Sequence, residues 1–307
     1  MLFDRHRTLT SGVPGLFQEI PKMTNLLALV DGSVYSQSVC DHAAWLARET
    51  AASVEIVHVL GRRDVSSHPS NLSGSIGLGA RTALLEELAE LDVQKAKLAH
   101  KRGRAILDDA KARISDAGVA EVATKLRNGE IVETVQELEE ETDLIVIGKR
   151  GEAADFDKLH LGSNLERVVR SSHKPVLVAS RAFTPVKKCL IAFDGGSSAM
   201  KAIEHVARSA IVEIDCQLLT VGVEPAGSMK RLEEAAALLR DAGYRVETRV
   251  EAGQPEAVIS QKVDNEGFNL LVMGAYGHSR IRQLIIGSTT TQMIRSCKIP
   301  VLLFHGS

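Results

Sequence analysis

The chain has 307 residues, of which 44% are hydrophobic and 25% are charged, and its formal net charge is -2. This composition is ordinary for a soluble globular protein, and the small net charge gives no reason to expect binding to nucleic acid or to a membrane. Aromatic residues make up 4% of the chain, too few for the stacking platforms of single-strand binders. The length favours two domains, each with its own core.

The cysteines are far apart in the sequence and show neither a C-x-x-C pair nor a zinc-binding spacing. We expect buried, reduced thiols in a cytoplasmic protein at Cys40, Cys189, Cys216 and Cys297. No apolar run approaches the roughly 20 residues that span a bilayer. Residues 1–22 contain no apolar core of signal-peptide length, and we interpret them as an N-terminal extension or an upstream start before Met23.

The first part of the chain alternates short apolar runs, typical of buried strands, with segments of helical periodicity. Strands are expected at 25–30, 54–60, 121–126, 143–147 and 176–179, and helices at 34–52, 81–115, 131–140 and 165–170. Residues 61–80 are rich in glycine, serine and proline and predict a mobile loop. Asp116-Ala117-Gly118 predicts a glycine stop for the long helix.

The long helix carries mixed charges, which we interpret as a solvated face rather than a binding stripe. Leucines recur along it at helical spacing: Leu84, Leu88, Leu91 and Leu98. We expect these leucines to cover the core of the first domain rather than to form a docking surface.

The same order of motifs then repeats in the second part of the chain. CLIAF before Asp194 corresponds to LALV before Asp31, and NLLVMGAYG corresponds to DLIVIGKRG. Strands are expected at 189–193, 217–223, 245–250, 270–273 and 301–304, and helices at 199–210, 232–240 and 290–294. The offset between equivalent residues falls from 163 at Asp31 and Asp194 to 126 at Gly148 and Gly274, so the first copy carries an insertion, mostly within 61–105.

Two copies of this alternating order predict an α/β protein with two tandem doubly wound, mainly parallel five-stranded sheets. We expect domains at 23–183 and 184–307, each with a sheet of its own, packed as an internal pseudo-dimer with a hinge at Phe183-Thr184-Pro185. In such sheets a ligand lies beyond the carboxyl ends of the strands, where the strand order reverses.

The stretch from Leu270 to Ile294 is the strongest candidate for a binding loop. Gly274 and Gly277 follow the strand directly, which lets the backbone turn sharply, and Gly287-Ser288-Thr289 is expected to supply hydroxyl caps for the next helix. N–H groups and hydroxyls at a helix start suit a phosphate. The alternative is an ordinary strand–loop–helix connection in which glycines serve only for turning.

The spacing Gly274-x2-Gly277-x9-Gly287-Ser288 resembles the nucleotide-binding signature of the universal stress protein family. The Asp-Gly-Ser after the opening strand, the Asp-Ala-Gly stop and the closing Pro-Val-Leu strand are also similar to that family, over residues 23 to about 305. The resemblance implies an adenine nucleotide alpha hydrolase-like fold. It also implies that the last strands of the two domains meet across a pseudo-twofold axis.

In nucleotide-binding members the first-strand aspartate contacts the nucleoside, and backbone at the end of the second strand holds adenine. The glycine loop and its hydroxyls hold the ribose and phosphates. Transferred to the second copy, the resemblance implies a site made of Asp194, Val221, Gly274, Gly277, Gly287, Ser288 and Thr289. The matching positions of the first copy are Asp31, Val59, Gly148, Gly151, Gly162 and Ser163.

The first copy departs from the pattern, because ten residues rather than nine separate Gly151 from Gly162 and they include two aspartates. Two carboxylates would oppose a triphosphate unless a metal intervenes, although Lys149 and Arg150 could compensate. The first site is therefore expected to be degenerate, and nucleotide binding is expected chiefly in the second domain.

We interpret the chain as a cytoplasmic regulatory protein that binds ATP or another adenine nucleotide, with magnesium as a candidate ion. An unidentified regulatory protein partner and further homo-dimerisation remain open, and neither nucleic acid nor membrane is expected as a partner. The first alternative is a protein-interaction module with vestigial nucleotide sites and a docking helix at 81–115. The second is a weak ATPase or nucleotidyl-transfer enzyme.

The sequence offers little for dedicated catalysis. Residues 194–198 resemble the SGGxDS loop of ATP pyrophosphatases but lack its leading serine and internal aspartate. His58 lies inside an apolar strand, where a buried or cleft-edge histidine is expected rather than a general base. No catalytic residue is assigned, and slow ATP hydrolysis is the most activity we expect.

Overall fold

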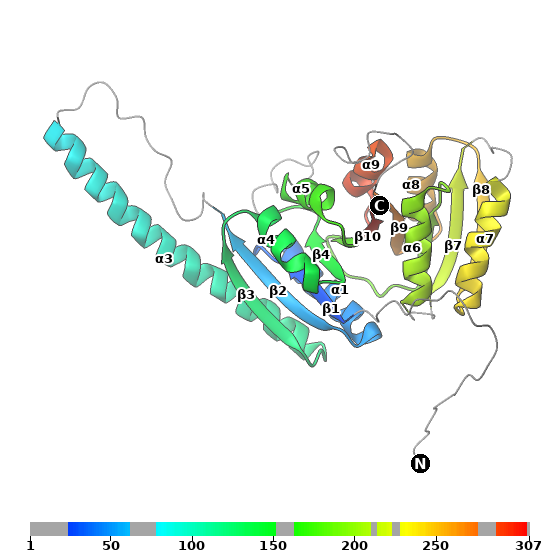
Figure 1. Ribbon diagram of the computed structural model, residues 1–307, viewed down its shortest axis with the longest axis horizontal. Helices are drawn as coiled ribbons and strands as arrows, with labels where there is room; N and C mark the ends of the chain where they lie inside the picture. Colours follow the sequence, from blue (N-terminus) through cyan, green and yellow to red (C-terminus); the bar gives the residue numbers. More distant parts are fainter. Residues whose placement is uncertain are drawn as a thin grey trace, which may run out of the picture.

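The computed structural model describes residues 24–61, 78–151, 163–209, 214–222, 228–275 and 287–305. Helices cover both faces of a central sheet, and one long helix extends away from the rest of the molecule (Figure 1). The expected extension at 1–22 and most of the expected loop at 61–80 lie outside the described residues. All four cysteines lie within them, and each is buried and free of disulfide bonds.

The first half of the chain, residues 24–183, contains the expected alternation of strands and helices. Its strands are β1 (Asn25–Leu29), β2 (Ser53–Leu60), β3 (Val122–Asn128), β4 (Leu144–Gly148) and β5 (Val176–Ala179). Its helices are α1 (Val34–Thr50), α3 (Leu78–Asp116), α4 (Ile131–Leu138) with the 3-10 turn η1 (Glu139–Glu141), and α5 (Ser163–Ser171).

The second half, residues 184–305, repeats this order. Its strands are β6 (Lys188–Ala192), β7 (Asp215–Val221), β8 (Arg245–Glu251), β9 (Leu270–Gly274) and β10 (Val301–Phe304). Its helices are α6 (Ser197–Arg208), α7 (Ser228–Asp241), α8 (Pro255–Asn265) and α9 (Ser288–Ser296). The sequence did not predict α8, in which the ammonium group of the buried Lys262 lies between Glu251 and Glu266.

The ten strands of the described chain form one sheet in the order β3-β2-β1-β4-β5-β10-β9-β6-β7-β8. Each half contributes five parallel strands, while β5 and β10 pair antiparallel with Leu177 opposite Leu302. The last strands therefore meet as expected, but the expectation of two separate sheets is wrong. An edge strand presents a row of N–H and C=O groups, and joining two such edges satisfies both rows at once.

Two hydrophobic cores lie on opposite faces of this sheet and run through both halves. Successive strand residues point to opposite faces. Leu26 and Ala28 of β1 therefore belong to the core under α1, α3, α6 and α7, while Leu27 and Leu29 belong to the core under α4, α5, α8 and α9. Because both faces of the sheet are covered, residues pointing to either face are apolar, and the strands appear in the sequence as continuous apolar runs.

The Asp-Ala-Gly stops end α3 and α7 in the same way. Gly118 and Gly243 have φ angles of +92° and +96°, a region that glycine enters without steric cost. The N–H of Gly118 donates to the carbonyl of Ser115, and that of Gly243 donates to the carbonyl of Arg240, each at 2.9 Å. The identical tripeptides thus make identical turns, as the sequence predicted.

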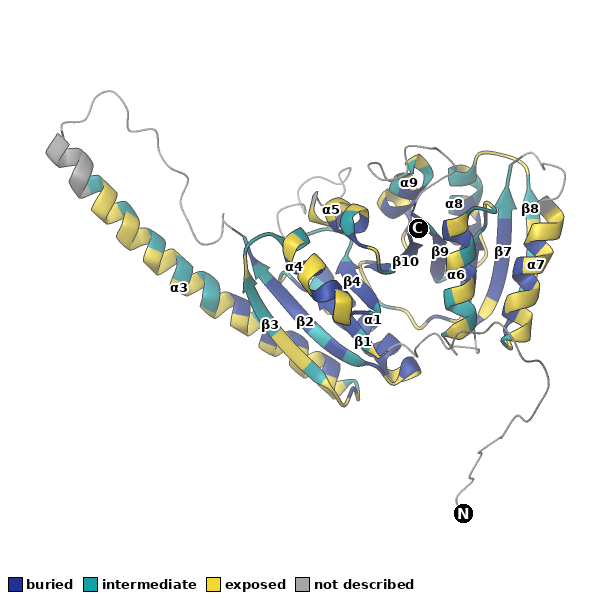
Figure 2. Ribbon diagram, viewed as in Figure 1, coloured by how far each residue is buried: buried dark blue, intermediate teal, exposed yellow. Residues whose placement is uncertain are grey.

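The insertion in the first copy lengthens one helix: α3 has 39 residues, and its counterpart α7 has 14. Only the later part of α3 packs on the sheet, through Leu107, Ala110 and Ile114 (Figure 2). The prediction that the leucine stripe covers the first domain is wrong, because Leu91 and Leu98 are 58% and 67% exposed. Helical spacing shows which residues share a face but not whether anything packs on it.

Candidate functional site

The first-strand aspartates form the same turn in both halves, at the edge of the sheet where the parallel strands end. Oδ1 of Asp31 accepts the N–H of Ser33 at 3.0 Å, and Oδ1 of Asp194 accepts the N–H of Gly196 at 2.8 Å. In the first half, Oδ1 also accepts the hydroxyl of Ser36 at 3.2 Å. One carboxylate oxygen of each aspartate therefore fixes its own turn.

Val59 and Val221, which the family resemblance assigns to adenine, lie beyond the last residues of β2 and β7 that pair with β1 and β6. Pairing of β1 with β2 ends at Val57 and that of β6 with β7 ends at Leu219, two residues before Val59 and Val221. The outer edges of both valines still pair with β3 and β8. No described strand lies along their inner edges, where main-chain groups could meet a planar base.

Side chains next to these valines secure the end of the first strand. Nδ1 of His58 donates to the carbonyl of Val30 at 2.8 Å, and Oγ1 of Thr220 donates to the carbonyl of Phe193 at 2.9 Å. His58 is buried, which confirms the prediction that it belongs to the core or the edge of a cleft. Its ring stabilises the turn before Asp31.

Packing explains why the first glycine of each loop has no side chain. A Cβ atom at Gly148 would lie 2.8 Å from Cβ of Tyr35, and one at Gly274 would lie 3.0 Å from Cβ of Ser198. Tyr35 and Ser198 are equivalent residues in the first turns of α1 and α6. These glycines let the helix approach the end of the strand, whether or not a ligand is bound.

The second glycine of the first loop lies against the first-strand aspartate. A Cβ atom at Gly151 would lie 2.9 Å from Oδ2 of Asp31, closer than real Cβ contacts allow. The structure thus brings together two residues that are 120 positions apart and that the sequence assigned to one site. Gly277 and Gly162 lie outside the described residues.

The start of α9 differs from the expected hydroxyl cap. The helix begins at Ser288, and its N-cap residue is Gly287, which supplies no side-chain cap. The hydroxyl of Thr289 donates to Oε1 of Glu256 at 2.8 Å, and that of Thr290 donates to the carbonyl of Gly274 at 3.1 Å. The prediction that Ser288 and Thr289 cap the helix is therefore wrong, because the helix already includes them.

The exposed residue Ser288 is the first of α9, and N–H groups in a first helical turn attract anions. The N–H of Gly287 donates to the carbonyl of Ala275 at 3.2 Å and so closes the base of the loop. In the first half, α5 begins at the equivalent Ser163, whose side chain lies outside the described set. The carboxylate of Glu256 opposes an anion at the start of α9.

Two arginines that no motif marked lie beside the aspartate turns. A Cβ atom at Gly195 would lie 3.7 Å from Nη1 of Arg231, and one at Gly32 would lie 3.9 Å from a terminal nitrogen of Arg102. Arg231 lies in α7 and Arg102 in α3. The two arginines do not align when the repeats are matched at their shared Asp-Ala-Gly stop. Comparison of the two copies in the sequence therefore could not identify them. A guanidinium here suits a phosphate or carboxylate.

Lys149, at the start of the first loop, contacts the other half of the chain. Its ammonium group donates to the backbone carbonyl of Cys297 at 2.8 Å, in the other half of the chain. Burial, with a smaller contribution from the nearby Arg150, lowers the pKa of Lys149 to about 8. The suggested compensation of the loop carboxylates by Lys149 stays a prediction, because Asp155 and Asp157 lie outside the described residues.

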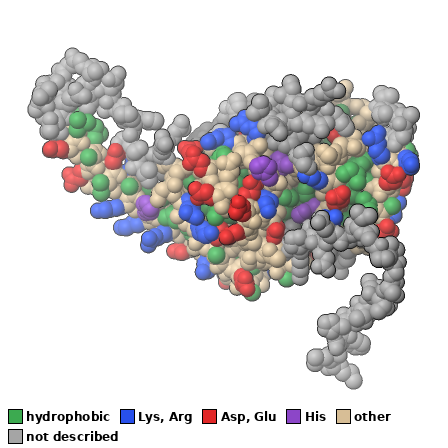
Figure 3. All heavy atoms as spheres, viewed as in Figure 1, with side chains coloured by type: hydrophobic (Ala, Val, Ile, Leu, Met, Phe, Trp, Pro, Cys, Tyr) green, Lys and Arg blue, Asp and Glu red, His purple; other side chains and the backbone are tan. Residues whose placement is uncertain are grey.

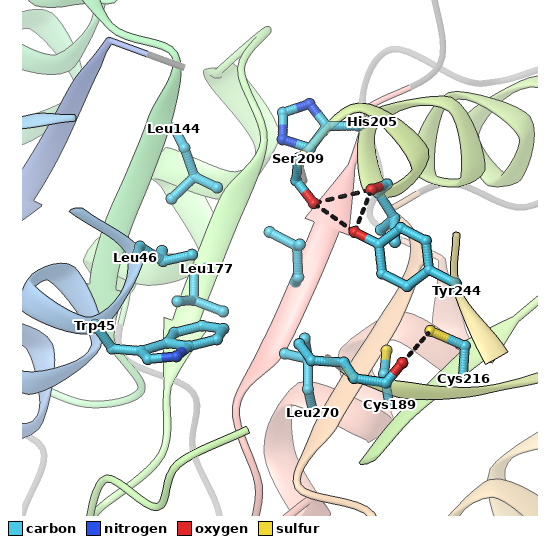
Figure 4. Close-up of a pocket in the computed structure, with 13 residues that line it drawn as sticks. Trp45, Leu46, Leu144, Leu177, Cys189, His205, Ser209, Cys216, Tyr244 and Leu270 are labelled. Carbon is cyan, nitrogen blue, oxygen red and sulfur yellow. Dashed lines mark hydrogen bonds between the residues drawn. The ribbon is translucent and has the colours of Figure 1, made fainter. Parts of the chain in front are cut away.

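A cavity of about 50 Å³ lies elsewhere, between the two halves (Figure 4). Its lining is mostly apolar and includes Leu144 and Leu270, the first residues of β4 and β9. It therefore lies toward the amino ends of these strands, away from the aspartate turns. Typical ligand pockets measure roughly 300–1,000 Å³, so this cavity is too small for a nucleotide.

Two further properties concern only the described part of the chain. None of its helices combines the length and the apolar character that crossing a membrane requires. No group of three or more His, Cys, Asp or Glu side chains within it is arranged to hold a metal ion.

Comparison with known proteins agrees with this fold. The sequence model of the universal stress protein family matches residues 23–180 and again residues 185–305. The chain belongs to the universal stress protein family. Universal stress protein Slr1230 of Synechocystis sp. is 38% identical over 287 residues, which cover 92% of this chain and all of that protein.

Two further universal stress proteins match nearly the whole length of the chain. One, from Mycolicibacterium smegmatis, is 22% identical and covers 91% of this chain and 96% of its own. The crystal structure of another, from Archaeoglobus fulgidus, superposes with a TM-score of 0.68 at 20% identity, covering 92% of this chain and 96% of that one. The tandem arrangement of this chain therefore has a counterpart among solved folds of the family.

Proposed function

We propose that this chain is a cytoplasmic regulatory protein that binds ATP or another adenine nucleotide, chiefly in its second half. The supporting observation is that three kinds of group meet at the carboxyl edge of the sheet there. These are the Asp194 turn, the inner edge of Val221 and the start of α9 at Ser288. Because β6 pairs with both β7 and β9, and Thr290 of α9 donates to the carbonyl of Gly274 at the end of β9, the three groups lie on neighbouring elements.

Each group matches one part of the ligand. Main-chain groups of Val221 receive the adenine base, and the carboxylate of Asp194 accepts hydroxyls of the nucleoside. Gly274, Gly277 and Gly287 are assigned to the phosphates, to which the N–H groups of Ser288 and Thr289 and the hydroxyl of Ser288 donate. Magnesium bound by the phosphates would offset part of the repulsion from Glu256.

The preference for the second half has a structural basis. The loop of the first half contains Asp155 and Asp157, and one of its two cations, Lys149, donates to Cys297 instead. A triphosphate at Asp31, Val59, Gly148, Gly151, Gly162 and Ser163 would therefore meet a less favourable field.

Arg231 is added to the proposed site because its guanidinium lies beside the Asp194 turn. A guanidinium can neutralise a phosphate and donate two parallel hydrogen bonds to it. Arg102 has the matching place in the first half and serves as the comparison residue. Because nucleotide binding is assigned chiefly to the second half, Arg231→Gln should weaken it more than Arg102→Gln does.

A protein-interaction module remains the second candidate function. The exposed leucines of α3 favour it, because Leu91 and Leu98 offer apolar surface to water far from the sheet. An unidentified regulatory partner could bind there whether or not the nucleotide site is occupied.

Calorimetric titration of the full chain with ATP, ADP and AMP, each with and without Mg²⁺, tests the proposed function. Binding by wild type that weakens at least tenfold in Arg231→Gln but less than threefold in Arg102→Gln supports the second-half site. Mass spectrometry of small molecules retained after gentle purification identifies which nucleotide is bound. Absence of binding by all three nucleotides would leave the interaction module as the better reading.

A further inference from the structure

Part of α3 stands away from the body of the protein, and we call residues 84–102 the arm. The body ends at Gly103, which is buried so closely that a Cβ atom there would lie 2.7 Å from Leu126 and 3.0 Å from His58. Beyond this point toward its beginning, the helix is mostly exposed or half-buried (Figure 2). The arm rises 1.5 Å per residue and is about 27 Å long.

The arm carries an apolar stripe. Leu84, Leu88, Leu91 and Leu98 fall on one side of the helix and fill four of the six a and d positions of a heptad, while Lys95 and Arg102 fill the other two. Leu91 and Leu98 are strongly exposed, and Leu84 and Leu88 are half-buried. Most of the stability of a helix in a protein comes from packing an apolar face. The stripe is therefore expected to pack against a partner.

Charge is segregated along the arm. Between 84 and 93 the charged residues are all acidic: Glu86, Glu87, Glu90 and Asp92. Between 94 and 104 they are all basic: Lys95, Lys97, Lys101, Arg102 and Arg104. Acidic side chains accordingly gather on the outer part of the arm and basic ones nearer the body (Figure 3).

The charge pattern of the arm is complementary to that of a second arm running in the opposite direction. An antiparallel copy places its acidic outer segment along the basic inner segment of the first arm, and the same contact forms again in the other direction. A parallel copy places like charges together, which is unfavourable. In this heptad Glu87 and Lys101 hold g positions, which flank the seam, and an antiparallel pair brings these opposite charges together.

We propose that the arm is a dimerisation element, in which two copies of this chain pair their arms antiparallel through the leucine stripe. The sheet edges that face each other in the centre of the molecule, β5 and β10, already pair within the chain. Apart from Arg102, which lies beside the Asp31 turn, the arm thus offers a second copy a surface separate from the candidate nucleotide sites. The interface is two-fold symmetric, as a closed homodimer requires.

Sedimentation analysis and light scattering of the full chain test this pairing. Wild type is expected to have twice the 33.1 kDa mass of one chain at micromolar concentration. Leu91→Asp with Leu98→Asp should raise the dimer dissociation constant at least 100-fold while leaving the thermal unfolding of the sheet unchanged. Leu238→Asp, which changes an exposed leucine on α7, is the matched control and should remain dimeric.

Charge substitutions test the orientation. Changing Glu86, Glu87 and Glu90 to lysine leaves Asp92 as the only acidic residue of the arm and should abolish the dimer. Adding Lys97→Glu, Lys101→Glu and Arg104→Glu in the same chain reverses six of the nine charges, all but Asp92, Lys95 and Arg102, and should restore the dimer. A monomeric wild type, a complex with a different polypeptide, or a dimer unaffected by the leucine substitutions would each overturn the proposal. So would a dimer that the three lysine substitutions leave intact, because a parallel pair would respond in that way.

Discussion

The ammonium nitrogen of Lys149 lies 2.8 Å from the backbone carbonyl oxygen of Cys297, so the first loop of one half contacts the last helix of the other. Cys297 is the C-cap residue of α9, where carbonyl groups lack partners within the helix and a cation is favourable. Burial nevertheless lowers the pKa of Lys149 to about 8, because the charged form loses hydration at this contact.

This contact predicts a pH-dependent difference between wild type and Lys149→Met. Between about pH 8 and pH 10.5, the side chain of Lys149 is protonated in the unfolded chain but not in the folded chain. The contribution of Lys149 to stability should therefore be largest above pH 10.5 and should be lost as the pH falls to 8. Chemical denaturation at both ends of this range measures it, with the exposed Lys187→Met as control. Equal pH dependence in wild type and Lys149→Met would contradict the assignment.

A second pH effect is expected at His205, whose ring packs on Phe304 with centroids 5.0 Å apart. Burial lowers the pKa of His205 to about 4, while Asp143 raises it and Arg208 lowers it to smaller extents. Between pH 6.5 and 4 the unfolded chain binds a proton here that the folded chain does not, so stability should fall as the pH is lowered through this window.

The variant His205→Gln removes this titration. Wild type should lose about 2 kcal/mol more unfolding free energy than the variant between pH 7 and pH 4, after allowance for partial exposure of the ring. Because His42 and His305 also have pKa values lowered by burial, only the difference between the two proteins is diagnostic. Parallel stability curves would show that His205 does not titrate in this window.

Short-range features of this fold could be predicted from the sequence. The strands appear as apolar runs because both faces of the sheet are covered, and the stops at Gly118 and Gly243 follow from local backbone geometry. The repeat placed Asp31 and Gly151 in one site before any contact was known, and the structure brings these residues together.

Features that depend on packing between distant elements could not be predicted. Nothing in the order of the repeats shows whether β5 and β10 join two sheets into one. The partner of Lys149 lies 148 residues further along the chain. The leucine stripe of α3 was assigned to the core because periodicity defines a face of the helix, whereas the length of the helix carries Leu91 and Leu98 beyond the sheet.

Glu256 provides a further test of the proposed site. Its carboxylate accepts the hydroxyl of Thr289 at the start of α9, where an anionic ligand would be repelled by it. Glu256→Gln should therefore raise the affinity for ATP about three- to tenfold, and that for AMP by less, because AMP carries less charge. Glu133→Gln makes the same change in net charge on α4 of the first half and should leave both affinities unchanged. Weaker ATP binding by Glu256→Gln would instead mean that the carboxylate assists the nucleotide, for example through magnesium.

The last prediction separates the two halves through their equivalent serines. Ser288 is exposed at the start of α9, and a hydrogen bond from its hydroxyl to phosphate is worth roughly 1.5–3 kcal/mol. Ser288→Ala should therefore weaken ATP binding roughly 10- to 150-fold, whereas Ser163→Ala should have a smaller effect because the first loop is longer and acidic.

Gly277→Val should also weaken binding, because a branched side chain restricts the backbone and keeps it away from the ligand. Calorimetric titration of ATP with magnesium compares these three variants with wild type, and thermal unfolding confirms that each is folded. If Ser163→Ala abolishes binding while Gly277→Val binds like wild type, the functional site lies in the first half. In that case the carboxylates of its loop, Asp155 and Asp157, would act with magnesium rather than against the phosphates.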